Sequence, residues 1–319
     1  MNLERLNQLL LDVWKTRDRL GERIAQEAGP TDLSKRQCLL EKEIYETLVA
    51  KAGKILTLPV RIVVEGYRAV ENDQARHTLY VDPLDGTAST ARWRNTGILE
   101  HGLPITTVLS MAPNKLELKF GDFVAAAALD LNSGQQWLAM QNQGALTCSA
   151  ADLQRKTLFR VKNYPRHSPR LACEFYRHIN WATRLLVNQA VEWTDMPSSF
   201  MNILLAVLGE TDCFFNNVVP EFSHEGQRGH ELGAISVFAR ELGAYAIDTR
   251  TGQPLFESLF TFDGMTPCIV GVDRDTVEYY WTMIRENLDK PFESGMMRDV
   301  IGRIHQSMET QRWSLRPAS

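Results

Sequence analysis

The sequence predicts an α+β fold built from two parts, and two observations carry this prediction. In the first half, apolar residues at helical spacing give way near residue 60 to short β-branched runs. In the second half, from about residue 198, helical and strand patterns alternate to near the end of the chain. We expect the boundary near residues 150–160, so that residues 1–155 form an N-terminal part and residues 156–319 a C-terminal part.

The first half is expected to contain two amphipathic helices followed by several strands. Residues 3–27 form the first helix, and the second begins after Thr31 or Asp32 and ends near Gly53. The predicted strands, which a turn at Gly144 closes, span residues 60–64, 77–81, 104–111, 120–131 and 135–140.

The second half is expected to alternate helices with short strands. A polar, glycine-containing loop covers residues 220–229, and Gly243 ends the helix that follows it. Helices are predicted for residues 198–208, 231–242, 274–288 and 295–311. Strands are predicted for residues 213–215, 245–247 and 268–271.

Composition and charge exclude several classes of function. The 319 residues carry 35 Lys and Arg against 39 Asp and Glu, a formal net charge of -4, which argues against a general nucleic-acid binder. No apolar run reaches the length of about 18 residues that a membrane-spanning helix needs, and the N-terminus lacks the apolar core of a signal peptide. The five cysteines are scattered without a CxxC pair, so we expect reduced thiols in a cytoplasmic protein.

The segment D-P-L-D-G-T at residues 82–87 follows a predicted strand and carries the strongest functional signal. Pro83 prevents further ladder pairing, so the chain must turn, and Asp85 is expected to return to the side of Asp82. Two carboxylates and the Leu84 carbonyl make an all-oxygen ligand set of the kind that Mg²⁺ prefers. The alternative is an acidic turn with a capped helix, because Asp-Pro and Asp-Gly are common turn dipeptides.

Hydrolysis of a phosphate ester requires that the negative charge of the phosphate is neutralised and that a water attacks in line with the leaving group. Two metal ions about 3.5–4 Å apart can supply both. Glu65 follows the neighbouring predicted strand and is the natural third carboxylate ligand. If Gly86 and Thr87 open a helix, their N–H groups would point at the phosphate. The Thr87 hydroxyl is then in position to orient the attacking water.

These residues resemble the signature of the inositol monophosphatase superfamily, which also contains fructose bisphosphatases and bisphosphate nucleotidases. The resemblance covers about residues 30–272. Besides residues 82–87, it is carried in the family's order by residues 102–111, 120–145, 198–215 and 230–244. It implies a layered α/β/α/β/α sandwich, a homodimer, and a Mg²⁺-dependent phosphatase that acts on a small phosphorylated substrate.

The resemblance also implies a set of site residues. The implied metal ligands are Glu65, Asp82, the Leu84 carbonyl, Asp85 and Glu231. The implied phosphate ligands are Gly86, Thr87 and Ala88. Among these residues, Glu65, Asp85 and Thr87 are the implied catalytic groups, with Thr87 helping to activate the water.

The sequence departs from the family pattern in three places. Gly66 follows Glu65 where the family often has a second acid, and Glu71 replaces that acid only if its loop folds back. The family's Trp-Asp pair reads His230-Glu231, which moves the carboxylate by about 1–1.5 Å. We expect His230 to fill the packing position of the tryptophan and not to bind metal. Residues 88–90 also differ from the family's Thr-Asn-Phe.

Zinc is not expected, because His224 and His230 lack a third His or a Cys at ligand spacing. The leading hypothesis is hydrolysis of an inositol phosphate or sugar phosphate-like monoester by a metal-activated water. Two alternatives stay open. One is a catalytically impaired relative that acts as a binding or regulatory protein. The other is a 3'(2'),5'-bisphosphate nucleotidase or fructose-1,6-bisphosphatase.

Overall fold

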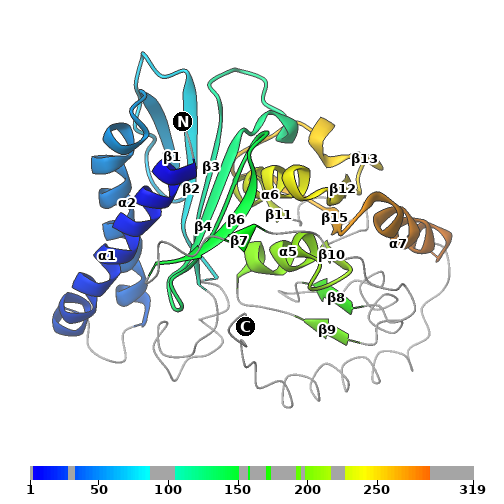
Figure 1. The fold of residues 1–319 in the computed structure, drawn as a ribbon, viewed down its shortest axis with the longest axis horizontal. Coiled ribbons are helices and arrows are strands. Elements are labelled where there is room, and N and C mark those ends of the chain that lie inside the picture. Colours follow the sequence, from blue (N-terminus) through cyan, green and yellow to red (C-terminus); the bar gives the residue numbers. More distant parts are fainter. Residues whose placement is uncertain are drawn as a thin grey trace.

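The computed structural model describes residues 3–27, 33–86, 105–150, 157–158, 170–173, 192–194, 198–216 and 227–287. Its helices and strands stack in five layers, α/β/α/β/α (Figure 1). This arrangement confirms the α+β class and the layered sandwich that the sequence resemblance implied. Within the described ranges, no helix is both long enough and apolar enough to cross a membrane.

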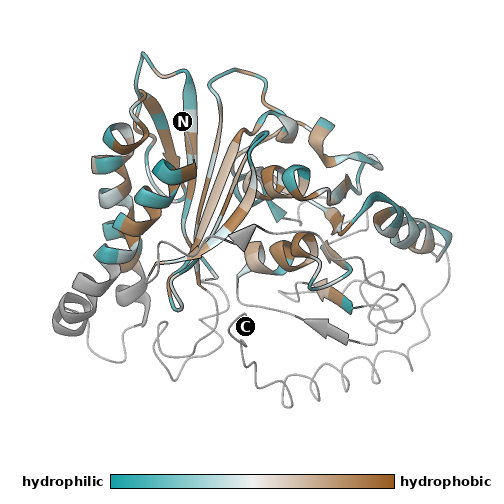
Figure 2. Cartoon of the chain, in the orientation of Figure 1, coloured by the Kyte–Doolittle hydropathy of each residue, from teal (hydrophilic) through white to brown (hydrophobic). Residues whose placement is uncertain are grey.

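The first sheet has seven strands whose spatial order follows the chain. β1 and β2 run parallel, and every later neighbouring pair is antiparallel. The third and fourth strands are buried along nearly their whole length and are mostly apolar, because both faces of the sheet are covered (Figure 2). The strands are β1 (Val60–Val64), β2 (His77–Asp85), β3 (Thr106–Pro113), β4 (Ala125–Asp130), β5 (Gln135–Met140), β6 (Gly144–Ser149) and β7 (Thr157–Leu158).

Helices α1 (Leu3–Glu27) and α2 (Leu33–Leu56) form the outer layer on one face of this sheet (Figure 1). The apolar positions of α1 recur every three or four residues, so one stripe of the helix is buried against α2, β4 and β5. Leu6, Leu10 and Val13 lie in that stripe and are almost completely buried.

Helices α5 (Ser199–Leu208) and α6 (Gly229–Leu242) form the middle layer between the two sheets (Figure 1). Because both sides of this layer are covered, α6 is buried from Gly229 through Ala239. α6 packs against β3, β4 and β5, whereas α5 packs against β8 (Arg170–Cys173), β10 (Cys213–Asn216) and β15 (Cys268–Gly271) of the second sheet. The start of each helix therefore lies between the two sheets.

The second sheet has six strands in the order β13-β12-β15-β10-β8-β9, and α7 (Arg274–Asn287) packs against its β12 and β15. A separate two-stranded ribbon joins β11 (Gln227–Arg228) to β14 (Met265–Thr266). The six strands are β8 (Arg170–Cys173), β9 (Glu192–Thr194), β10 (Cys213–Asn216), β12 (Tyr245–Asp248), β13 (Gln253–Pro254) and β15 (Cys268–Gly271). Short 3-10 turns cover Phe120–Asp122 and Leu255–Glu257.

Several predicted boundaries were wrong for local physical reasons. The expected strand at residues 120–131 begins only at Ala125, because the Asp122 carboxylate accepts a hydrogen bond from the Lys119 N–H and closes a 3-10 turn first. Gly144 begins strand β6, which was not predicted, and does not end the sheet. The predicted helix at residues 295–311 lies outside the described residues. The division at residue 155 stays a prediction, and β7 just beyond it still belongs to the first sheet.

Candidate metal and phosphate site

The site begins where the two parallel strands β1 and β2 end side by side. Val64 pairs with Val81 in the register of these strands. The next residues, Glu65 and Asp82, therefore emerge at the same edge of the sheet. The Glu65 N–H donates to the Val81 carbonyl at 3.0 Å, which holds the Glu65 backbone against the end of β2.

The backbone between Asp82 and Asp85 is an irregular stretch of β2 and not the turn that the sequence predicts after Pro83. The pairing of β2 with β3 shifts between these two residues. Oδ1 of Asp82 accepts from the Leu84 N–H at 2.9 Å, and the Pro83 carbonyl accepts from Thr107 Oγ1 at 2.9 Å. This irregularity keeps both carboxylates buried in one place.

The two remaining positions of this segment follow from its backbone. Gly86 has a φ of 104°, a value that favours glycine and excludes a helical conformation at this residue. Thr87, the other residue of the expected helix start, lies outside the described residues. Leu84 lies between the two aspartates with a buried side chain, and metal binding by its carbonyl stays a prediction.

The Asp85 carboxylate joins the first sheet to the start of α5. Oδ2 accepts hydrogen bonds from the Phe200 N–H at 2.9 Å, from Thr106 Oγ1 at 3.2 Å and from Ser198 Oγ. Among the described residues, Oδ1 accepts one hydrogen bond, from the Ser199 N–H at 3.2 Å. The unpaired N–H groups at a helix start are natural partners for an anion. Oδ1 thus keeps the greater capacity for a further ligand.

The start of α6 supplies two more side chains. The Gly229 N–H donates to the Gly264 carbonyl at 3.0 Å, which draws the helix start against residues 261–264. His230 follows, packs its ring 5.0 Å from that of Phe262, and donates from Nδ1 to the Phe262 carbonyl at 3.3 Å. Glu231 is the next residue and lies in the first helical turn.

Four of the predicted metal ligands come together in two overlapping groups. Glu65, Asp82 and His230 form one group, and Asp82, Asp85 and Glu231 form the other. Within each group, one ligand atom from every residue lies within 4.8 Å of the others. Asp82, Asp85 and Glu231 are 3–5% exposed. The shared member is Asp82, so a change at this residue alters both groups.

Burial changes the proton affinity of this cluster. Burial raises the pKa of Asp82 to about 7, although the hydrogen bond from the Leu84 N–H acts in the opposite direction and lowers it. Burial and then the neighbouring Asp82 charge raise the pKa of Asp85 to about 6. Burial and then the charge of Arg228 lower the pKa of His230 to about 4, so the imidazole is neutral at pH 7.

His230 is the residue whose position sequence reasoning missed. Its ring does pack against Phe262, as the tryptophan position suggested. Its Nε2, however, faces the acids, at 3.5 Å from Oε2 of Glu65 and 3.5 Å from Oδ2 of Asp82. No local signal in the sequence marked this direction, because adjacent residues of a helix, such as His230 and Glu231, do not in general face each other.

Several other residues considered in the sequence lie elsewhere or outside the described part. Glu71 is exposed and forms an ion pair with Arg61 at 2.9 Å, so it does not replace the missing acid after Glu65. Arg228 forms an ion pair with Oε1 of Glu65, which leaves Oε2 facing His230. The predicted phosphate ligands Thr87 and Ala88 lie outside the described residues, as does His224.

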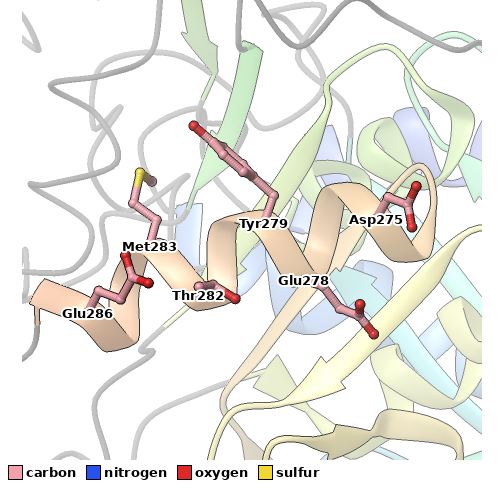
Figure 3. A pocket seen from close by; sticks show the side chains of 6 residues that line it. All are labelled: Asp275, Glu278, Tyr279, Thr282, Met283 and Glu286. Carbon is pink, nitrogen blue, oxygen red and sulfur yellow. The ribbon is translucent and has the colours of Figure 1, made fainter.

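A separate hollow of about 530 Å³ lies along one face of α7 (Figure 3). Its lining consists of Asp275, Glu278, Tyr279, Thr282, Met283 and Glu286. All six residues come from a single helix, and none belongs to the two acidic groups. A site for catalysis normally needs polar groups that converge from several elements, and the cluster around Asp82 meets that requirement.

Gly229 controls how closely α6 approaches residues 261–264, and this contact yields a prediction. A Cβ at Gly229 would lie 1.9 Å from the Thr261 carbonyl oxygen. We expect Gly229→Ala to lower the free energy of unfolding by about 1–3 kcal/mol and to weaken divalent-cation binding, because it displaces His230 and Glu231. The matched control is Gly53→Ala, where the added Cβ meets nothing within 4 Å. Thermal unfolding and Mn²⁺ titration measure both effects, and wild-type values for Gly229→Ala would contradict this role.

Comparison with known proteins supports the fold. No family model matches the sequence, and no curated protein gives a significant match. Among solved structures, a Pyrococcus horikoshii protein described as having similarities to inositol-1 monophosphatase aligns with a TM-score of 0.63 and 14% identity. The alignment covers 87% of this chain and 97% of that one.

Two further structures carry ligands in their descriptions. SaIMPase-II with inositol monophosphate bound aligns with a TM-score of 0.60 and 14% identity, over 96% of this chain and 99% of that one. A calcium-bound inositol monophosphatase family protein from Staphylococcus aureus has a TM-score of 0.60 and 12% identity, over 88% and 95% of the two chains. Likeness at this identity establishes architecture, and activity is a separate question. The chain therefore has the fold of the inositol monophosphatase superfamily, in agreement with the resemblance of its sequence.

Proposed function

We propose that this chain is a divergent member of the inositol monophosphatase superfamily and a divalent-metal-dependent phosphomonoester hydrolase. Its expected substrate is a small phosphate monoester of the inositol phosphate or sugar phosphate kind. Mg²⁺ is the cation expected at the all-oxygen group, which consists of Asp82, Asp85 and Glu231. The observation that carries the proposal is the convergence of four carboxylates around Asp82, namely the buried Asp82 and Asp85 of β2, the buried Glu231 of α6, and the partly exposed Glu65 just after β1. Buried carboxylates that face one another need a cation or protons between them.

The residues present fit a divalent cation. Asp82, Asp85 and Glu231 offer three carboxylates within ligand distance of one another, and hard oxygen ligands suit Mg²⁺. When bound, such cations neutralise phosphate charge and lower the pKa of a water. Within the described residues, Arg228 is the cation paired with these acids, through Glu65. Four carboxylates against one guanidinium leave an excess of negative charge at this site.

Other residues of the chain orient the carboxylates or are expected to contact the phosphate and the attacking water. Hydrogen bonds from the Ser199 and Phe200 N–H groups at the start of α5 hold the Asp85 carboxylate in a fixed orientation. Asp82 holds its place through the Leu84 N–H. Glu65 lies at the edge of the group and is the most exposed of the acids, with 27% of its side chain accessible. We propose that Gly86, Thr87 and Ala88 contact the phosphate and that Thr87 orients the attacking water.

Two of the structural neighbours support this choice of chemistry. One is described with inositol monophosphate bound and another with calcium bound, in proteins of the same fold. We extend a small phosphorylated substrate and a divalent cation to this chain on that basis. A cytoplasmic location, a homodimer, and the absence of nucleic-acid and membrane partners stay predictions of the sequence.

The test is phosphate release by the purified chain in the presence of Mg²⁺. The substrate panel contains an inositol monophosphate, a sugar bisphosphate and a nucleoside 3',5'-bisphosphate, which also separates the bisphosphatase and nucleotidase alternatives. We expect turnover of at least one ester and its loss on addition of a chelator. No release from any ester with Mg²⁺ or Mn²⁺ would contradict the proposal.

The pairing of Arg228 with Glu65 favours one second candidate, a relative with impaired catalysis that binds its ligand without turning it over. In that case, the Arg228 guanidinium neutralises the Glu65 carboxylate, which catalysis would need as a ligand for the metal cation. Calorimetric binding of an inositol phosphate without any phosphate release would support this second function. Arg228→Ala would then increase cation binding and restore some hydrolysis.

A further inference from the structure

We propose that Nε2 of His230 is a metal ligand, so that Glu65, Asp82 and His230 form a mixed nitrogen and oxygen site for a transition-metal dication such as Zn²⁺, Co²⁺ or Mn²⁺. The inference deepens the proposed function, on which it rests for the presence of a divalent-cation site. It differs from an all-oxygen magnesium centre because one ligand is an imidazole. Imidazole nitrogen suits zinc, cobalt and related metals better than it suits Mg²⁺.

The orientation of the imidazole is the first observation behind this site. Nδ1 lies 3.3 Å from the Phe262 carbonyl oxygen, which can only accept a hydrogen bond. The proton of the neutral ring is therefore on Nδ1, and Nε2 presents its lone pair to the acids. Histidine ligands of metals commonly donate their other N–H to a backbone carbonyl in this way, which sets the tautomer and the ring orientation.

The environment of Nε2 is the second observation. His230 is 1% exposed, and Nε2 is buried without a hydrogen-bond partner among the described residues. It lies instead 3.5 Å from Oε2 of Glu65 and 3.5 Å from Oδ2 of Asp82. Three electron-rich atoms that face one another, two of them on buried side chains, repel, and a cation between them removes that repulsion.

The distances agree with ligands of one metal ion. Bonds of about 2.0–2.2 Å to nitrogen and oxygen place neighbouring ligand atoms about 3.0–3.5 Å apart in octahedral or tetrahedral geometry. The 3.5 Å separations of Nε2 from the two carboxylate oxygens lie at the upper end of this range. Arg228 pairs with Oε1 of Glu65, so it leaves Oε2 for the ion.

The neighbouring structure holds this imidazole in place. Tyr80 of β2 stacks on Phe262 with ring centroids 5.8 Å apart, and Phe262 in turn contacts the His230 ring. Gly229 allows residues 261–264 to lie directly against the start of α6. A ligand held by packing and by a second hydrogen bond is already in the orientation that metal binding requires.

The all-oxygen group of Asp82, Asp85 and Glu231 lies beside this site and shares Asp82 with it. The two groups therefore differ in metal preference, with Mg²⁺ favoured at the oxygen group and a transition metal favoured where His230 contributes. Zinc was not expected from the sequence because no third His and no Cys stands at ligand spacing from His230. Glu65 and Asp82 take those places from other parts of the chain.

The test is pulsed electron paramagnetic resonance on the metal-free full chain loaded with Mn²⁺, with and without ¹⁵N-labelled histidine. We expect a directly coordinated histidine nitrogen whose coupling changes with the isotope. His230→Phe, which keeps a ring against Phe262, should lose that coupling and weaken Zn²⁺ binding by about 10-fold or more. Its Mg²⁺ binding should change by less than about threefold, because Mg²⁺ gains little from imidazole.

The matched control is His77→Phe, at the opposite end of β2, which should keep both the coupling and the Zn²⁺ affinity of the wild type. No histidine coupling in the wild type would overturn the proposal, and that result needs no variant to fold. Coupling that persists in folded His230→Phe would overturn it as well. Metal binding is measured without substrate, so its outcome is distinct from that of the phosphatase assay. Hydrolysis without histidine nitrogen coupling would refute only the His230 site. Coupling without hydrolysis would refute only the enzymatic function.

Discussion

Asp85→Asn is expected to reduce phosphate release by about 10³-fold, because it removes a ligand of a metal ion that would stabilise developing charge by several kcal/mol, and each 1.4 kcal/mol is about tenfold in rate. The asparagine amide cannot serve both sides of the carboxylate. Oδ2 faces three donors, from Ser198, Thr106 and Phe200, so the amide oxygen must occupy that side. Its NH₂ group then faces the Ser199 N–H and the cation, and both contacts are repulsive.

The matched control for this variant is Asp248→Asn, which changes another buried aspartate that lies in β12 and pairs with Arg250. We expect Asp248→Asn to lower the melting temperature and to keep the specific activity of the folded fraction. Steady-state kinetics on both variants, together with melting temperatures, separate the two effects. Activity of Asp85→Asn close to that of the wild type would remove Asp85 from the site.

The second large effect is expected in the pH dependence of stability. Without cations, the folded chain holds Asp82 with a pKa of about 7 and Asp85 with a pKa of about 6, against 3.8 for an ordinary aspartate. Between these limits the folded state binds more protons than the unfolded state. Its free energy of unfolding therefore falls as the pH rises from about 4 to about 7, by up to about 1.4 kcal/mol per pH unit for each proton.

A divalent cation should reverse this loss, because it replaces the protons on the same carboxylates. We expect Mn²⁺ to raise the melting temperature strongly at pH 8 and weakly at pH 5. The control is Asp82→Asn, which removes the charge with the most raised pKa and should be more stable than the wild type at pH 8 without metal. Equal stabilisation by Mn²⁺ at pH 5 and pH 8 would contradict the coupling of proton and metal binding.

Much of the fold could be predicted from the sequence because its signals are local. The helix at α1 follows from apolar spacing, and the ends of β1 and β2 place Glu65 and Asp82 at one edge. The short strands β8 and β9 were missed because three or four residues carry too little pattern to distinguish a strand from a loop.

The parts of the site that sequence reasoning missed depend on contacts across long stretches of chain. Ser198 could be recognised as a helix start, but its bond to Asp85 joins residues 113 positions apart. The direction of the His230 ring depends on the carbonyl of Phe262, 32 residues later. Neither partner has a local signature, so only the folded chain brings them together.

The most direct test of the central claim is the binding of Mn²⁺ to the metal-free chain, measured by calorimetry for the wild type and for Asp82→Asn. The claim is that carboxylates from separate strands and a helix hold divalent cations around one shared residue. It predicts that the wild type binds Mn²⁺ and that Asp82→Asn, although folded, loses binding at both groups together. Wild-type affinity in folded Asp82→Asn, or no binding by the wild type at millimolar Mn²⁺, would contradict it.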